Sequence, residues 1–144
     1  MGFNEVLGVD ALWWYHHKDG MSDDLKPLAW IGNSQKELRA FPEDVKDVMG
    51  YALHLAQAGG KHDAVKPLAG FGGAGVLEVV DDYDGDTYRA VYTVKFADQV
   101  YVLHAFQKKA KKGIKTPKQE IDLIRERLKV AEADHTARAK GGRK

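Results

Sequence analysis

Cysteine is absent from the 144 residues of the chain. Its absence excludes disulfides, thiolate catalysis and zinc sites that are built on cysteine. Long apolar runs are also absent, because no stretch approaches the ~20 residues that a membrane-spanning helix needs. The N-terminus shows no basic segment followed by an apolar stretch of about 7–15 residues, so we expect no signal peptide. These absences predict a cytoplasmic protein without a membrane segment.

Acidic and basic residues nearly cancel over the whole chain, which has a net charge of +1, but they are unevenly distributed. Residues 1–107 contain 9 Lys and Arg against 16 Asp and Glu, whereas residues 108–144 contain 13 against 5. A basic C-terminal part is typical of a surface that binds a polyanion or an acidic protein partner. The alternative is a basic helix and tail that only face solvent.

Three regions can be distinguished along the chain. Residues 1–24 contain a short aromatic run and a polar loop, and we interpret them as an N-terminal extension of undetermined role. Residues 25–133 carry regular apolar patterns that predict one folded domain. Residues 134–144 are polar and basic, and we expect the chain to fray after about Ala133.

The first part of this domain predicts a strand followed by two helices. The short apolar run Lys26–Ile31 is interpreted as a strand. Ser34 and Glu37 have the spacing of a capping box, and Pro42 suits the first turn of a second helix. The second helix has an apolar stripe and ends near residue 58. Residues 61–75 are rich in Gly and Pro, so they predict a loop.

Three strand-like runs and a last helix complete the domain. The runs cover residues 76–80, 87–96 and 99–106, and the short turns between them make them antiparallel neighbours. Thr116 as cap, Pro117 at the first helical position and Gln119 as capping-box partner predict a helix start. The order β-α-α-β-β-β-α predicts an α+β fold. It consists of a small antiparallel sheet with two N-terminal helices and a C-terminal helix, all packed on one face.

Two motifs are better explained by turns than by ligand sites. Gly70–Gly75 matches G-x-G-x-x-G, but a dinucleotide site needs a strand before it and a helix after it. Here a loop precedes the motif and a strand-like run follows. The aspartates of residues 81–86 lack the Gly and Glu of an EF-hand loop, and their Asp-Gly pair is typical of a hairpin turn. The histidines form no metal-binding pair, so we expect no metal and no cofactor.

Arg89 is the strand residue with the clearest chemical potential. Alternation along residues 87–96 assigns Tyr88, Ala90, Tyr92, Val94 and Phe96 to the core face, and Thr87, Arg89, Val91, Thr93 and Lys95 to the outward face. A guanidinium on a rigid strand can clamp two phosphate oxygens. The alternative is a cross-strand ion pair. The same test gives no clear core face for residues 99–106.

Six lysines are concentrated in residues 106–118, between the last strand and the last helix. Lysines attract phosphate without reading sequence, and a helix N-terminus adds exposed N–H donors. His104 ends the preceding strand and is a candidate for proton transfer near neutral pH. The alternative for His104 is a structural histidine at a sheet edge.

Several short segments follow one another in an order that is typical of a known family. They are Lys66–Gly70, Gly75–Val79, Thr87–Tyr92, Leu103–Lys109 and Lys115–Pro117. Through them, residues from about 25 to about 132 resemble the RelE/ParE toxin superfamily, in its HigB-like, phage-derived branch. The resemblance implies a RelE-like fold and the toxin of a type II toxin–antitoxin pair. It also implies a hetero-oligomer with a cognate antitoxin, expected to be a helix-turn-helix protein.

RelE-like members of this superfamily cleave mRNA in the ribosomal A site without a metal, through attack of the RNA's own 2′-OH on the adjacent phosphate. This chemistry needs cationic stabilisation and a proton donor and acceptor. Arg89 matches the family's strand arginine, Lys108 and Lys109 match its basic residues after the last strand, and His104 is an acid/base candidate by position. The resemblance therefore implies these four residues as catalytic. The expected RNA-binding residues are Lys95, Lys111, Lys112, Lys115 and Lys118.

Two other functions stay open at this level. One is a ParE-like inhibitor of DNA gyrase, which is a binding module rather than a nuclease. The other is a catalytically weak regulator that acts through its antitoxin complex. Arg89 and His104 favour the endoribonuclease.

Overall fold

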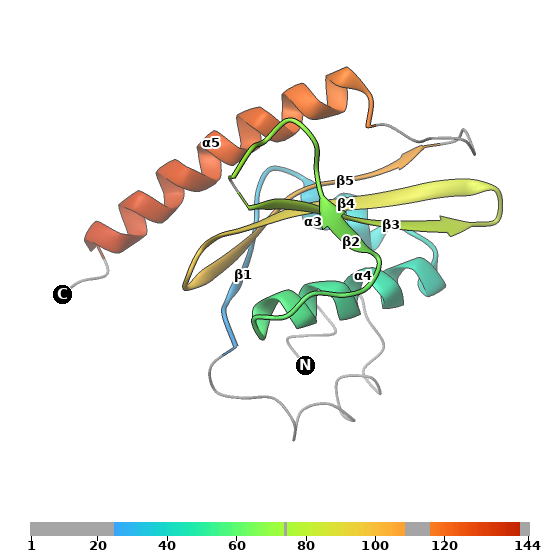
Figure 1. Ribbon diagram of the computed structural model, residues 1–144, viewed down its shortest axis with the longest axis horizontal. Helices are drawn as coiled ribbons and strands as arrows, with labels where there is room; N and C mark the ends of the chain where they lie inside the picture. Colours follow the sequence, from blue (N-terminus) through green and yellow to red (C-terminus); the bar gives the residue numbers. More distant parts are fainter. Residues whose placement is uncertain (1–24, 74, 109–115, 142–144) are drawn as a thin grey trace.

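The computed structural model of the protein describes residues 25–73, 75–108 and 116–141 (Figure 1). In chain order its elements are β1 (Leu28–Trp30), α3 (Ser34–Arg39), α4 (Glu43–Gln57), β2 (Val65–Pro67), β3 (Val76–Tyr83), β4 (Asp86–Phe96), β5 (Gln99–Lys108) and α5 (Lys118–Gly141). The α+β prediction is confirmed. Both N-terminal helices and all three long strands lie close to their expected positions.

The strands form one five-stranded sheet in the order β1-β5-β4-β3-β2. β3, β4 and β5 are antiparallel neighbours, as the short turns predict. The sheet also has two short edge strands. β1 runs parallel to β5, with Leu28 opposite Val100, so the sheet is mixed. β2 pairs antiparallel with β3 inside the segment that the sequence predicts as a loop. Three residues are too few to show an alternating pattern, so the sequence gives no signal for β2.

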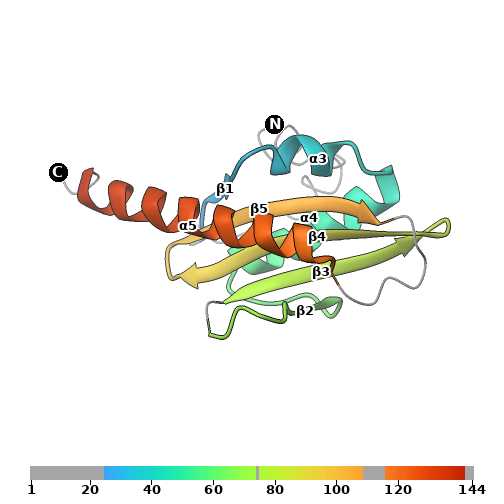
Figure 2. The same ribbon diagram turned by 90° about the horizontal axis from the view of Figure 1, so that it is seen from above.

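Helices cover both faces of the sheet, so the prediction that they pack on one face is wrong (Figure 2). α3 and α4 cover one face, and α5 crosses the other. The α4-side core includes Leu38, Val45, Met49, Leu53, Val79, Ala90, Tyr92, Val100, Val102 and Ala105. The α5-side core includes Ile31, Leu68, Phe71, Val76, Val91, Tyr101, Leu103, Phe106, Ile124, Leu128 and Ala131. A sheet that is apolar on both faces needs cover on both, and α5 supplies the second layer.

β5 contains a β-bulge at Leu103. Val102 lies opposite Tyr92 and His104 lies opposite Val91, so Leu103 is an extra residue in the ladder. Val102 and Ala105 therefore belong to the α4-side core, whereas Leu103 packs on the α5 side. The bulge explains why simple alternation along residues 99–106 gives no clear core face. It also brings His104 to the face that α5 covers.

α5 continues to Gly141, so the prediction of fraying after Ala133 is wrong. Its C-terminal half is held to the sheet by specific contacts. Tyr101 donates a hydrogen bond of 2.6 Å to Asp134, and the His135 ring stacks on Phe96 at 4.2 Å between centroids. Over the described ranges, no helix combines the length and apolar character that crossing a membrane requires.

Candidate functional site

Arg89 lies in a buried polar cluster on the α5 side of the sheet. Its Nη1 donates to Oε1 of Glu78 at 3.0 Å and to Oγ1 of Thr116 at 3.3 Å. The Arg89 and Glu78 residues are only 2% and 4% exposed. The prediction that Arg89 points outward to solvent is therefore wrong, because the sequence gives no sign that α5 covers this face. The alternative of a cross-strand ion pair is confirmed.

Thr116 connects the start of α5 to this cluster. The sequence predicts that Thr116 caps the helix, but its hydroxyl donates to Oε1 of Glu78 at 3.3 Å. The first helical bond runs from the N–H of Ile121 to the carbonyl of Pro117, and the helix begins at Lys118. The helix start is thus anchored to a carboxylate on β3.

His104 is held between two side chains of α5. Its Nε2 lies 2.6 Å from Oε1 of Glu120, and its Nδ1 lies 3.4 Å from Nη1 of Arg127. A guanidinium can only donate, so Nδ1 accepts and the proton of the neutral ring sits on Nε2, which donates to Glu120. Burial lowers the pKa of His104 below its usual 6.5, although the hydrogen bond to Glu120 acts in the opposite direction. His104 is therefore neutral at neutral pH, with its tautomer fixed by its neighbours.

The strand register places Arg89 of β4 diagonally next to both Glu78 of β3 and His104 of β5. Val91 lies opposite both Glu78 and His104, and Arg89 stands two residues before Val91 on the same face. Diagonal neighbours on a sheet are about 7–8 Å apart, within reach of long side chains. The sheet thus gathers a carboxylate, a guanidinium and an imidazole beneath the first turns of α5. Arg89 and His104, both predicted as site residues, are brought together.

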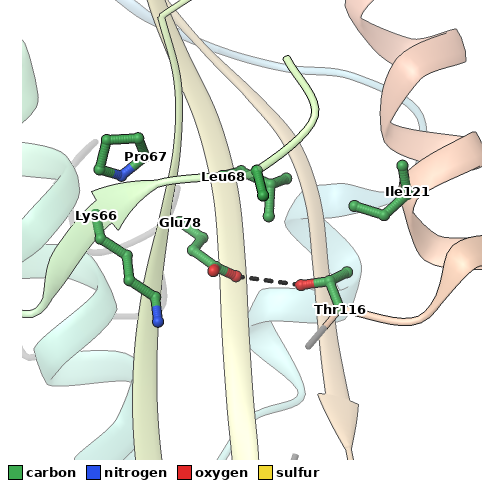
Figure 3. Close-up of a pocket in the computed structure, with 7 residues that line it drawn as sticks. Lys66, Pro67, Leu68, Glu78, Thr116 and Ile121 are labelled. Carbon is green, nitrogen blue, oxygen red and sulfur yellow. Dashed lines mark hydrogen bonds between the residues drawn. The ribbon is translucent and has the colours of Figure 1, made fainter. Parts of the chain in front are cut away.

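A pocket of about 350 Å³ opens beside this cluster, between β2, β3 and the first turn of α5 (Figure 3). Its lining residues are Lys66, Pro67, Leu68, Ala69, Glu78, Thr116 and Ile121. The carboxylate of Glu78 and the hydroxyl of Thr116 face each other across the dashed hydrogen bond in Figure 3. The pocket therefore combines apolar walls with a buried carboxylate, and its size is at the lower end of the range for small-molecule sites.

Of the predicted lysines that the structure describes, two form ion pairs away from the cluster. Lys95 pairs with Glu132 in the C-terminal half of α5, and it lies six residues along β4 from Arg89, about 20 Å away. Lys118 pairs with Asp122 on the exposed side of α5 at 2.8 Å. Lys108 is the last residue of β5. The remaining predicted positions, Lys109, Lys111, Lys112 and Lys115, lie outside the described residues.

Sequence reasoning missed the groups that hold Arg89 and His104 in place. Glu78 has a signal in the sequence, because it is a single carboxylate inside the apolar run 76–80, and such a residue indicates a buried partner. Glu120 and Arg127 have no comparable signal, since charged residues are normal on an amphipathic helix. Among residues 25–73, 75–108 and 116–141, no three His, Asp or Glu side chains gather into a metal-binding group.

One comparison with known proteins gives a match. The family model described as "Phage derived protein Gp49-like (DUF891)" matches residues 36–129, which is more than half of the chain. The matched range extends from α3 to Lys129 of α5, so it includes Glu78, Arg89 and His104. Neither the curated proteins nor the solved structures that were compared give a match.

Proposed function

The chain belongs to the Gp49-like family of phage-derived proteins, and we propose that it is the toxin of a type II toxin–antitoxin system. In this proposal the toxin is a ribosome-dependent endoribonuclease that cleaves mRNA in the cytoplasm and stops translation. A cognate antitoxin, a helix-turn-helix protein, binds it and neutralises it. The resemblance to the HigB-like branch and the α+β fold of the described residues support the proposal.

The observation that carries the proposal is the His104–Glu120 pair beside Arg89. In the proposed reaction the 2′-oxygen bonds to phosphorus, the P–O5′ bond breaks, and a cyclic phosphate remains. The 2′-OH proton passes to a base, and the leaving 5′-oxygen takes a proton from an acid. Glu120 is the more exposed member of the pair, and the His104 ring, which is more buried, hydrogen-bonds the Glu120 carboxylate. We assign Glu120 as the base that contacts RNA and His104 as its positioning residue.

The cationic role falls to the basic segment rather than to the buried arginine. Lys108 at the end of β5 and Lys109 directly after it in the sequence are the candidates for stabilising the phosphorane charge. Lys111, Lys112, Lys115 and Lys118 add electrostatic attraction for the RNA backbone. Arg89 contributes by holding Glu78 and Thr116, and through Thr116 the start of α5. It is a positioning residue in this assignment.

Mapping of mRNA 5′ ends after induction of the full-length chain tests the proposal. Wild type should stop translation and cut inside codons of translated mRNA, and Glu120→Gln should reduce cutting by about 100-fold or more. The double variant Lys108→Ala/Lys109→Ala should reduce it as well. Glu126→Gln is the matched control, because Glu126 is an exposed carboxylate on the same helix. Intact mRNA with the wild-type protein would refute the nuclease.

A ParE-like inhibitor of DNA gyrase is the second candidate. The observation that favours it is the burial of Arg89 against Glu78, because an arginine in such a pair is not presented to a phosphate. A supercoiling assay with purified gyrase separates the two candidates. Gyrase inhibition together with uncut mRNA would replace the first proposal by the second.

A further inference from the structure

The pocket beside Glu78 has a chemistry that the proposed cleavage does not use. Its walls are apolar at Pro67, Leu68 and Ile121, and a carboxylate that is almost fully buried forms part of its lining. Within the part of the chain that the structure describes, the hydrogen bonds to this carboxylate both end on Oε1. Oε2 therefore keeps its two lone-pair sites for a donor that enters the pocket.

The charges around Glu78 select the type of donor. Nη1 of Arg89, 3.0 Å away, already balances the carboxylate, and Lys66 stands directly opposite Glu78 on β2. A second cation such as an arginine side chain of a partner protein would be repelled by both. A neutral group with N–H donors can bind Oε2 without that penalty. The apolar walls at Pro67, Leu68 and Ile121 can pack against a ring.

We propose that this pocket binds a guanine base of RNA. In this arrangement Oε2 of Glu78 accepts from N1–H and from the exocyclic amino group, which are adjacent donors on one edge of guanine. Leu68 and Ile121, which line the pocket together with Lys66 (Figure 3), contact the ring, and Lys66 binds the attached phosphate. The inference rests on the proposed function for RNA as the source of the base, and it gives the enzyme a preference for guanine next to the cleaved bond.

The other bases fit less well for a simple reason. Adenine and cytosine each offer one amino group beside a ring nitrogen that accepts, and that nitrogen would face the carboxylate. Uracil offers a single N–H between two carbonyl oxygens. A site that is built around paired donors rejects a base that lacks one of them.

An NMR titration of the full-length chain with nucleoside monophosphates tests the inference. GMP should shift the backbone amides of Leu68, Thr116 and Ile121. IMP, which is GMP without the exocyclic amino group, should bind at least about tenfold more weakly, and AMP more weakly still. Lys66→Ala should weaken the binding of GMP but not the binding of guanosine, which has no phosphate. Equal binding of GMP, IMP and AMP would overturn the inference.

The variant Glu78→Gln provides a second, independent test of the guanine site. It should abolish the preference for GMP over IMP, since the amide offers a donor where the carboxylate offers an acceptor. The wild-type comparison of GMP with IMP stays decisive if this variant does not fold. Binding of N-acetylarginine amide in place of GMP would overturn the inference in favour of a protein partner. GMP binding without mRNA cleavage would refute the nuclease alone, and cleavage without GMP binding would refute the pocket alone.

Discussion

Arg89 of β4 and Glu78 of β3 form an ion pair of 3.0 Å beneath α5, with side-chain exposures of only 3% and 6%. Each of these two buried charges needs the other to compensate for its lost hydration. The attraction between them offsets their loss of hydration only while both are present. The pair also bonds Thr116, so it ties the sheet to the segment that enters α5.

Removal of one partner of this pair should destabilise the protein strongly. Arg89→Met keeps the volume of the side chain but leaves the carboxylate of Glu78 buried without its counter-charge. We expect the free energy of unfolding to fall by about 3–5 kcal/mol. The double variant Glu78→Leu/Arg89→Met should recover at least about half of this loss, because no isolated charge remains. Denaturant unfolding monitored by circular dichroism measures both values.

The exposed pair Lys118–Asp122 is the matched control. Its side chains are 86% and 59% exposed, so Lys118→Ala should change the free energy of unfolding by less than about 1 kcal/mol. If Arg89→Met lowers the free energy of unfolding by no more than Lys118→Ala does, the Arg89–Glu78 pair is not desolvated in solution. The measurement also bears on tests of the proposed function, because an Arg89 variant is informative about that function only when the variant is folded.

Burial of His104 should make stability depend on pH. Burial lowers the folded-state pKa of His104 below 6.5, so in the pH window between these two values the unfolded chain holds the proton and the folded chain does not. The free energy of unfolding should therefore fall as the pH drops below 6.5. The slope has an upper limit of about 1.4 kcal/mol per pH unit.

Comparison with His104→Gln isolates this contribution, since every other titrating group is common to both proteins. The difference in the free energy of unfolding between wild type and variant should shrink as the pH falls from about 7.5 to about 5. A difference that stays constant over this window would mean that His104 titrates alike in the folded and unfolded chains.

Local patterns are enough to predict much of this fold. Alternating residues in β4 act over a few neighbouring positions, so single-sequence reasoning finds this strand. The position of α3 is predicted as well, but its capping box is wrong. Ser34 is the first residue of the helix and its hydroxyl donates to the carbonyl of Val102, and the N-cap residue Asn33 makes no side-chain capping bond. β2 and the bulge at Leu103 depend instead on pairing with distant strands. A three-residue edge strand and a single inserted residue are both too short to carry a local sequence pattern that specifies this pairing.

The site shows the same division. Alternation in β4 correctly groups Arg89 with Val91 and Thr93, because side chains two residues apart share a face. Alternation does not say which element covers that face, so it cannot predict that Arg89 is buried. The position of His104 in the sequence points to it as a candidate, but its partners Glu120 and Arg127 lie 16 and 23 residues further along the chain. Only the packing of α5 brings them to it.

The last turns of α5 should contribute to stability, in contrast to a frayed tail. A chain that ends at Ala133 loses the hydrogen bond from Tyr101 to Asp134 and the stacking of His135 on Phe96. We expect the free energy of unfolding to fall by about 2–3 kcal/mol. A chain that ends at Ala137 keeps both contacts and should lose less than about 1 kcal/mol. Equal stability of the two truncated chains would mean that these contacts do not hold the helix.

Gly32 connects backbone conformation to the titration of His104. Its φ is +59°, and an added Cβ would lie 2.8 Å from Cζ of Arg127, so Gly32→Ala must displace that guanidinium. The positive charge of Arg127 lowers the pKa of His104, and displacement of this charge should raise the pKa.

Gly72→Ala is the matched control, because Gly72 has a φ of +57° and no described atom lies within 4 Å of its added Cβ. Both variants should lose about 1–2 kcal/mol through backbone strain, but only Gly32→Ala should shift the imidazole titration of His104 measured by NMR. An unchanged titration in Gly32→Ala would show that Arg127 does not act on His104.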